Sequence, residues 1–162
     1  MKNLFLLRHA HSDNNNFIDF ERNLSEEGFN KCQDLAKILQ DYKIDLIISS
    51  SAIRTMQTVE TILLELKQTS VEYKRDLYNA SESKLLKFLN NIENEYNNVL
   101  LVNHNPAISK LAMNLAYPSI HSDFYPEIQL GFSPGSLALY QCNIESWADF
   151  AASNSKLISF WR

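Results

Sequence analysis

Glycine is scarce in this sequence of 162 residues, where only Gly28, Gly131 and Gly135 occur. The glycine-rich loops that cradle phosphates in P-loop and dinucleotide-binding proteins need several glycines within a few residues. The sequence contains no such loop. If the protein binds an anion, side chains must therefore supply much of the binding.

Cysteine and long apolar runs are also scarce. Cys32 and Cys142 lie far apart and have neither metal-binding nor redox spacing, so we expect two reduced core thiols in a cytoplasmic protein. The apolar stretch at the N-terminus is too short for a signal-peptide core, and no segment approaches membrane-spanning length. We expect no membrane partner.

The charge balance is only mildly acidic. The sequence has 15 Lys and Arg against 19 Asp and Glu, a formal net charge of −4, and no run of basic residues. A nucleic-acid partner is therefore not expected. No repeat, low-complexity tract or linker divides the chain, and its length suffices for one core. We predict a single domain over residues 1–162, and the sequence carries no indication of its oligomeric state.

The strongest local pattern is the apolar run Leu4–Leu7, which ends abruptly in Arg8 and His9. Four consecutive large apolar residues predict a strand buried on both faces, as in the centre of a parallel sheet. Asp45–Ile48 and Val99–Val102 have the same character. We therefore expect three central strands.

Amphipathic helical patterns follow these strands. Ser25 and Ser81 are good helix caps, and Asn105 with Pro106 predicts a cap and first residue of a further helix. The remaining elements are an edge strand, a long loop and two closing strands, expected at 71–73, 118–134, 136–140 and 157–161. Alternating strands and helices predict an α/β fold, a three-layer α/β/α sandwich with a mostly parallel central sheet.

Three of the predicted strand ends carry cationic or imidazole side chains. Arg8 and His9 follow the first strand, Arg54 lies in the first turn after the second, and His104 follows Val99–Val102. Ligands of open α/β sheets bind beyond the carboxyl ends of strands, so these side chains can converge. Arginine matches phosphate oxygens with forked donors, and a histidine among arginines is pushed toward its neutral, nucleophilic form. The pattern predicts a phosphoryl-transfer site.

Taken singly, each of these residues has an ordinary structural explanation. An arginine in a first helical turn is usually solvated, and a histidine at a strand end usually pairs with its neighbours. Their occurrence together favours function. His11 could line the pocket or face solvent, and Ser12 and Asn15 are candidate phosphate donors with loop capping as the alternative.

Several longer stretches, in order along nearly the whole chain, carry a family resemblance. They are Leu7–Ala10, Asp19–Gly28, Asp45–Thr58, Leu77–Ser81, Val99–Pro106 and Phe132–Ala138. They resemble the histidine phosphatase superfamily and, within it, the phosphohistidine phosphatases of the SixA type. The combination of Arg-His, Arg-x-x-Gln-Thr and His-Asn-Pro motifs is specific. The resemblance implies a phosphoglycerate mutase-like fold and a phosphatase with no metal or organic cofactor.

The same resemblance implies a role for each matching residue. His9 would be the nucleophile that becomes transiently phosphorylated. Arg8, Arg54 and His104 would bind the transferred phosphoryl group, and Arg22 would be a further substrate contact. The expected substrate is phosphohistidine in a protein, or another small phosphorylated molecule.

The sequence departs from the family pattern in two places and lacks one expected group. Asn103 stands where the family usually has glycine, and Asn23 where it usually has proline. Larger members also carry a clear acid that protonates the leaving group, and none is evident here. The candidates are Asp19, Glu21, Asp76 and Glu82, and a loop or helix-capping role is the better explanation for each of them.

Two other functions remain as alternatives. His9 and His11, with His104 as a third ligand, could form a metallohydrolase site, although Arg8 and Arg54 would repel a cation there. A phosphate-binding regulatory module without turnover is the second alternative. Asn103 and the missing acid favour it, and the presence of all four predicted catalytic side chains disfavours it.

Overall fold

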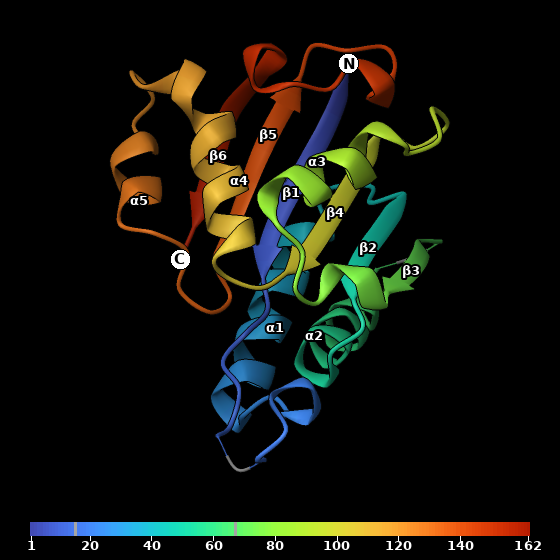
Figure 1. Cartoon of the computed structure of the whole chain (residues 1–162), viewed down its shortest axis with the longest axis vertical. Coiled ribbons are helices and arrows are strands. Elements are labelled where there is room, and N and C mark those ends of the chain that lie inside the picture. Colours follow the sequence, from blue (N-terminus) through green and yellow to red (C-terminus); the bar gives the residue numbers. More distant parts are fainter. Residues whose placement is uncertain (15, 67) are drawn as a thin grey trace.

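A computed structural model describes residues 1–14, 16–66 and 68–162, which contain one six-stranded sheet in the order β3-β2-β4-β1-β5-β6 (Figure 1). The first four strands in that order run parallel, and β5 and β6 are antiparallel to their neighbours. This arrangement confirms the predicted mostly parallel sheet. The strands are β1 (Lys2–Arg8), β2 (Leu46–Ser50), β3 (Ser70–Lys74), β4 (Asn98–Asn103), β5 (Leu137–Cys142) and β6 (Ser155–Trp161).

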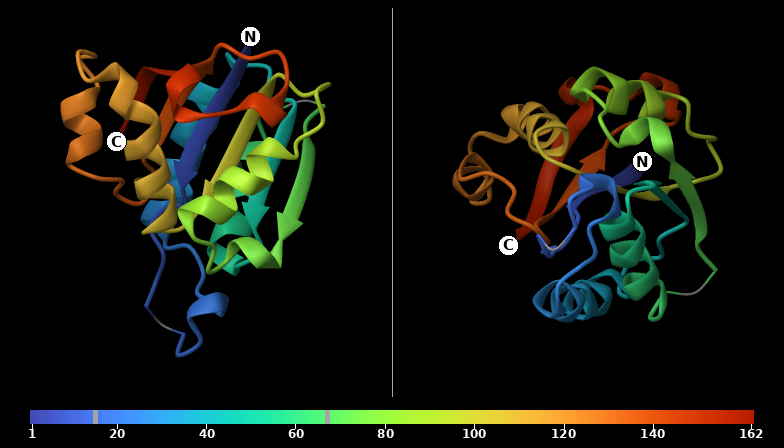
Figure 2. Two further views of the ribbon diagram at one scale, coloured as in Figure 1. Left: turned by 45° about the horizontal axis from the view of Figure 1, so that its top comes forward. Right: turned by 60° about the horizontal axis from the view of Figure 1, so that its bottom comes forward.

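Helices cover both faces of the sheet and complete the three layers. Helices α1 and α2 lie on one face, and α3, α4 and α5 lie on the other (Figure 2). In the described ranges, no helix is both long enough and apolar enough to span a membrane. The helices are α1 (Glu26–Leu39), α2 (Ile53–Leu63), α3 (Glu82–Asn90), α4 (Ala107–Ala116) and α5 (Tyr125–Gln129).

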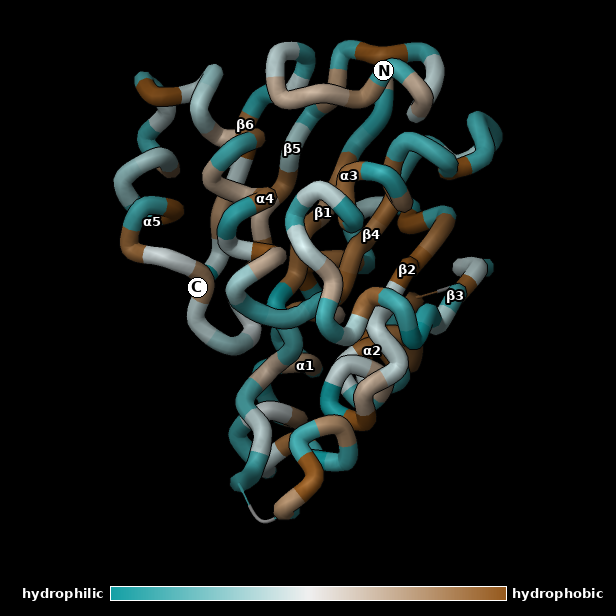
Figure 3. Tube along the Cα trace, viewed as in Figure 1, coloured by the Kyte–Doolittle hydropathy of each residue, from teal (hydrophilic) through white to brown (hydrophobic). Residues whose placement is uncertain are grey.

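Strand β1 supplies the core on both sides of the sheet. Its side chains alternate, so Leu4 and Leu6 pack into the cluster under α3 and α4, and Phe5 and Leu7 pack into the cluster under α1 and α2. All four are fully buried, each stabilising the fold by about 1.5–3 kcal/mol relative to an exposed position. The central strands accordingly form the most hydrophobic part of the chain (Figure 3). Both cysteines are buried free thiols, as predicted.

The register of the parallel strands brings their carboxyl ends to one edge. Arg8 of β1 pairs with Asn103 of β4, and Ser49 of β2 pairs with Val102 of β4. The residues that follow are therefore neighbours, and the His9 N–H donates to the Asn103 carbonyl oxygen over 3.1 Å. Figure 1 shows the arrowheads of β1, β4 and β2 at this same edge.

The start of α4 differs from the prediction. The helix begins at Ala107 with Pro106 as its cap, whereas the sequence predicted Asn105 as the cap. The Asn105 side chain has other partners, because its Oδ1 accepts from Ser109 Oγ (2.6 Å) and its Nδ2 donates to the Phe132 carbonyl oxygen (3.0 Å). The residue therefore ties α4 to the chain before β5.

The predicted loop over residues 118–134 also contains helical structure that we did not expect. A 3₁₀ turn covers Tyr117–Ser119, and α5 covers Tyr125–Gln129. Pro126 lies in the first turn of α5, where the missing N–H of proline costs nothing. Ile128 is fully buried and holds this short helix against α4.

The segment between β1 and α1 extends beyond the carboxyl edge of the sheet (Figures 1 and 2). It leaves and returns through an isolated antiparallel bridge between Ser12 and Leu24. Helix α1 then packs tightly against the start of the segment. A Cβ atom placed on Gly28 would lie 2.1 Å from the His11 carbonyl oxygen, so only glycine fits there.

We predict that Gly28→Ala destabilises the protein. Alanine is normally the better helix former by about 1 kcal/mol, but here its methyl group would collide with backbone. Overpacking of this kind costs about 1–3 kcal/mol. Urea denaturation should show the loss, and the exposed neighbour Asn30→Ala in the same helix is the control, with equal or slightly higher stability. Equal stability of both variants would show that α1 can move away from His11 at little cost.

Candidate active site

A cavity of about 400 Å³ lies at the carboxyl ends of β1, β2 and β4. All four side chains predicted to carry the chemistry line it, and so does Arg22. The convergence that the strand-end argument anticipated is therefore present. The described lining residues are Arg8, His9, His11, Ser12, Asn14, Asp19, Arg22, Arg54, His104, Asn105 and Pro134.

The histidine at the tip of β1 has a defined tautomer. His9 Nδ1 lies 2.7 Å from the Ala10 carbonyl oxygen, which can only accept, so Nδ1 carries the proton. The other ring nitrogen, Nε2, accepts from Arg54 Nε over 3.3 Å. Burial, together with the charges of Arg54 and Arg8, lowers the pKa of His9 to about 3. His9 is thus a neutral imidazole with its Nε2 lone pair directed into the site.

Arg54 lies at the second residue of α2, immediately after β2. Its helix is tied to the end of β1 through Thr58, whose hydroxyl donates to the Arg54 carbonyl oxygen (2.7 Å) and accepts from the Ala10 N–H (3.3 Å). The guanidinium is almost fully buried. Besides His9, it contacts the Asp19 backbone carbonyl through Nη1 and the Asp19 carboxylate through Nη2, the latter over 2.9 Å.

Arg8 reaches the cavity from the last position of β1. Its Nη1 donates to the Phe132 carbonyl oxygen over 2.8 Å, which orients the guanidinium. In the part of the chain that the structure describes, Arg8 Nε is buried without a hydrogen-bond partner. Burial, with the charge of Arg54, lowers the pKa of Arg8, yet arginine stays protonated near neutral pH. Arg8 therefore retains a donor for an anionic ligand.

His104 stands beside His9, with ring centroids 5.1 Å apart. Its Nε2 lies 2.9 Å from Ser50 Oγ at the end of β2, and its Nδ1 has no partner among the described residues. Burial, with the His9 ring and Arg54, lowers the pKa of His104 to about 3. The site therefore holds two neutral imidazoles. Asn103 has an ordinary negative φ, and its side-chain oxygen accepts from the His104 N–H over 2.8 Å.

Arg22 lies at the mouth of the cavity, on the segment between β1 and α1. Its Nη1 donates to Asp19 Oδ1 (3.1 Å), its Nη2 to Ser12 Oγ (2.8 Å) and its Nε to the Asp13 carbonyl oxygen (2.9 Å). The geometry suits the predicted role in anion binding. Asn15, the other predicted substrate contact, lies outside the described residues.

His11 and Asn23 serve the scaffold of the same segment. His11 is exposed on the lining of the cavity, and its Nδ1 lies 2.8 Å from Oγ of Ser25, the residue that caps α1. Asn23, where the family usually has proline, accepts from Gln57 Nε2 over 2.9 Å. Gln57 also accepts from the Leu24 N–H over 2.7 Å, so α2 holds the returning end of the segment.

Asp19 is a site residue that the sequence analysis named only as one of four candidate acids. It lies in a 3₁₀ turn, η1 (Asp19–Glu21), and is the one carboxylate among the described lining residues. Tyr78 donates to its Oδ2 over 2.5 Å and packs edge-on against the His104 ring at 5.5 Å. The Tyr78 hydrogen bond, with those from Arg54 and Arg22, holds the pKa of Asp19 well below its usual range. The signals in the sequence were the spacing of Asp19 from Arg22 and the matched Leu77–Ser81 stretch.

The other three candidate acids lie outside the cavity lining. Asp76 pairs with Lys84 at 3.4 Å, and Glu82 accepts from Asn114 over 2.8 Å. Glu21 does not line the cavity either. Among the described residues, the one carboxyl group at the cavity is therefore that of Asp19, and its lowered pKa disfavours the protonated form that a proton donor needs.

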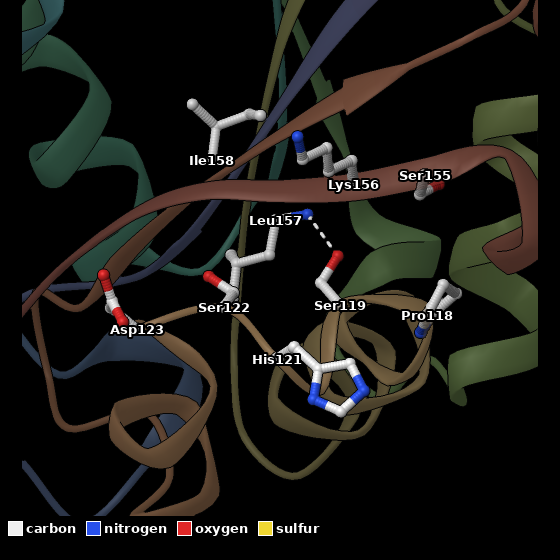
Figure 4. A pocket seen from close by; sticks show the side chains of 9 residues that line it. All are labelled: Pro118, Ser119, His121, Ser122, Asp123, Ser155, Lys156, Leu157 and Ile158. Carbon is white, nitrogen blue, oxygen red and sulfur yellow. Dashed lines mark hydrogen bonds between the residues drawn. The ribbon is translucent and has the colours of Figure 1, made fainter.

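A larger cavity, of about 680 Å³, lies away from the strand ends, between β6 and the chain that follows α4. There the Leu157 N–H donates to Ser119 Oγ over 3.0 Å, and the Lys156 and His121 side chains do not point toward one another (Figure 4). Among the described residues that line this cavity, Lys156 is the one lysine or arginine, so it offers no pair of such cations to an anion. Cavity size alone would therefore identify the wrong site for an anion.

The metallohydrolase alternative gains no support from the geometry. Over the described ranges, no group of three or more His, Cys, Asp or Glu side chains is arranged to hold a metal ion. The cavity is instead lined by Arg8, Arg22 and Arg54, whose charges repel a cation. The arrangement fits a dianion with oxygen acceptors.

Comparison with known proteins gives a consistent result. A family model of the histidine phosphatase superfamily (branch 1) matches residues 4–84. The chain is similar to a structure assigned as phosphohistidine phosphatase SixA from Nakamurella multipartitia, with a TM-score of 0.88, 24% identity, and 99% of this chain and 95% of that one covered. It is also similar to a structure assigned as phosphohistidine phosphatase SixA from Agrobacterium tumefaciens, with a TM-score of 0.82 and 26% identity. That match covers 99% of this chain and 97% of the other. An uncharacterised Mycobacterium leprae protein is 25% identical over 118 residues, 72% of this chain and 70% of that protein. The predicted phosphoglycerate mutase-like fold is confirmed.

We predict that the two buried histidines make stability fall in mild acid. Their pKa values are about 3 in the folded protein, against 6.5 as the ordinary value. Between these limits the unfolded chain binds more protons, so the free energy of unfolding decreases as the pH falls from about 6.5 toward 3. By pH 5 each histidine should account for a loss of up to about 2 kcal/mol. Urea midpoints at pH 7 and pH 5 should differ less for His104→Gln than for the wild type, and an equal difference would contradict the neutral form of His104.

Proposed function

The chain belongs to the histidine phosphatase superfamily, and we propose that it hydrolyses phosphoramidate bonds, with phosphohistidine in proteins as the preferred substrate, through a phosphoenzyme on His9. The observation that carries this proposal is the pairing of a neutral, correctly oriented His9 Nε2 with a cavity that has no positioned acid. The first feature supplies the nucleophile. The second feature favours substrates whose leaving group needs no proton from an acidic side chain of the protein.

In the first step, His9 Nε2 attacks the phosphorus atom, and the bond between phosphorus and the substrate nitrogen breaks. Arg8 and Arg54 are placed to neutralise the phosphoryl oxygens, and their fork geometry matches two oxygens at once. The leaving imidazole can be protonated on its own ring at neutral pH before the bond breaks. It therefore departs as a neutral molecule without a protein acid.

In the second step, water attacks the phosphorus atom, and the bond to His9 Nε2 breaks. His9 Nδ1 keeps its proton throughout, because this N–H donates a hydrogen bond to the Ala10 carbonyl oxygen over 2.7 Å. Phosphorylated His9 is thus cationic and leaves phosphorus as a neutral imidazole, ready for another cycle. The water contributes its oxygen to the phosphate, and its released proton passes to the phosphate or to solvent.

His104 is placed to respond to the charge of the substrate. Its imidazole is neutral in this environment, and a dianion beside it favours the protonated form. A protonated His104 would add a third cationic donor to the phosphoryl group after binding. Its Nδ1, unpartnered in the described part of the chain, is the atom available for this contact.

Two further observations support a phosphohistidine phosphatase. The Nakamurella and Agrobacterium proteins that the chain resembles are both assigned as phosphohistidine phosphatases. The free, buried state of Cys32 and Cys142 fits a reducing compartment, so we place the activity in the cytoplasm. A regulatory module without turnover would not need the oriented His9 nucleophile.

The test compares a phosphohistidine peptide with a phosphoserine peptide of the same sequence. An alkyl phosphate leaves as a strongly basic alkoxide and needs a proton donor, a contribution of about 100-fold or more. We expect kcat/KM to favour phosphohistidine by at least about that factor. His9→Ala is the control, and it should abolish turnover of both peptides.

Comparable kcat/KM values for the two peptides would contradict the substrate assignment. They would mean that a carboxyl group protonates the alkoxide after all. Full activity of His9→Ala would instead contradict the covalent mechanism.

A further inference from the structure

The Asp19 carboxylate occupies the donors that a phosphoryl group would use. Its Oδ2 accepts from Arg54 Nη2 at 2.9 Å and from the Tyr78 hydroxyl at 2.5 Å. Its Oδ1 accepts from Arg22 Nη1 at 3.1 Å. Both oxygens of a carboxylate are thereby placed between two guanidiniums, as two oxygens of a phosphoryl group would be.

In this arrangement each of the three nitrogens of Arg54 already donates a hydrogen bond, which engages three of its five N–H groups. Its Nη1 contacts the Asp19 backbone carbonyl, its Nη2 the Asp19 carboxylate and its Nε the His9 ring. Arg22 is equally committed, because its three nitrogens donate to Asp19, Ser12 and the Asp13 carbonyl oxygen. An anion that binds through these donors of Arg54 Nη2 and Arg22 Nη1 must therefore compete with the Asp19 carboxylate.

We propose that Asp19 is an internal competitor for the phosphoryl site, which a substrate must displace from Arg54 and Arg22 and which returns as phosphate leaves. The inference deepens the proposed function, on which it rests only in taking this cavity as a phosphoryl-binding site. It assigns Asp19 a role in setting the affinity for anions.

The solvent exposure of Asp19 reduces one cost of this displacement. The Asp19 side chain is 52% exposed, so its charge can move into water without a large desolvation change. The 3₁₀ turn η1 that carries it contains no buried residue. Phe20 of the turn packs edge-on against Tyr78 at 4.8 Å and under the Arg75 guanidinium at 4.3 Å, and Arg54 contacts the backbone carbonyl of Asp19.

The consequence is a threshold on binding. A tethered carboxylate competes at a high effective concentration, so it weakens the apparent affinity of every anion by the same factor. Weakly held monoanions are then excluded at ordinary concentrations, whereas a phosphoryl dianion still binds. The same competition speeds the release of phosphate after hydrolysis.

A different role for Asp19 would have a different signature. If the carboxylate stayed in place, it would act by repulsion, and a dianion would be repelled about twice as strongly as a monoanion of the same shape. Tungstate and perrhenate provide such a pair, because both are tetrahedral oxyanions, with charges of −2 and −1. Displacement of Asp19 weakens the binding of both anions by the same factor, whereas static repulsion weakens the binding of tungstate much more than that of perrhenate.

The experiment is a calorimetric titration of wild type and Asp19→Asn with tungstate and with perrhenate. We expect Asp19→Asn to bind both anions more tightly, by about tenfold or more and by the same factor for each, as for a site that the competitor fills at least about 90% of the time. A far larger gain for tungstate than for perrhenate would overturn displacement in favour of repulsion. Unchanged or weaker binding of both would overturn any competing role.

A second variant weakens the hydrogen bonding of Asp19 and leaves the charge of Asp19 unchanged. Tyr78→Phe keeps the ring contacts with Phe20 and His104 but removes the hydroxyl that donates to Asp19 Oδ2. Displacement should become easier, so both anions should bind a few times more tightly. Weaker binding in Tyr78→Phe would overturn the proposal, because the hydroxyl would then be a ligand of the anion itself.

Asp76→Asn is the matched control. It removes the same negative charge, but Asp76 pairs with Lys84 and does not line the cavity, so both affinities should stay within about twofold. A gain equal to that of Asp19→Asn would overturn the proposal in favour of a general charge effect. These titrations need no turnover, so the expected gains together with no hydrolysis of phosphohistidine would refute the proposed function while the competitor role stands.

Discussion

The hydrogen bond from His9 Nδ1 to the Ala10 carbonyl oxygen is the interaction on which the rest of the site depends. Because a carbonyl oxygen can only accept, this bond fixes the proton on Nδ1 and leaves Nε2 as the free base. Its geometry follows from β1, whose buried run Leu4–Leu7 holds the backbone rigidly up to the point where His9 emerges. The adjoining Ala10 is itself buried and donates its N–H to Thr58 of α2. The packing of the central strand therefore fixes the direction in which His9 Nε2 points.

The cations around this nitrogen act twice. Burial and, beside it, their charges favour the neutral imidazole, so His9 stays unprotonated in mild acid, and the cations also provide the donors for a phosphoryl group. Gathering Arg8, Arg22 and Arg54 in one cavity is costly unless their donors are satisfied. The Phe132 carbonyl oxygen and the Asp19 carboxylate satisfy part of that need, whereas Arg8 Nε has no partner among the described residues. A carboxylate in this position balances the charge of the arginines, and it is also what a substrate must compete with.

The sequence indicated much of this arrangement because its informative residues lie in regular structure. The apolar runs before Arg8 and His104 predicted strand ends, and the register of β1, β2 and β4 brings those ends together. The predicted caps Ser25 and Ser81 also lie where expected. Asp19 could not be singled out from the four candidate acids because η1 has no hydrophobic period, and the tertiary contacts with Arg54 and Tyr78 distinguish it. Helix α5 was hidden for a related reason, since its proline suggested a loop.

The account centres on Nε2 of His9 as the attacking atom, and the position of the phosphoryl group on the trapped enzyme tests this most directly. A reaction quenched in base should preserve a phosphohistidine, which mass spectrometry can assign to a residue and ³¹P NMR to one of the two ring nitrogens. The account predicts that the phosphoryl group is on Nε2 of His9, since Nδ1 is committed to the Ala10 carbonyl oxygen. A phosphoryl group on Nδ1, or on His104 rather than His9, would contradict it.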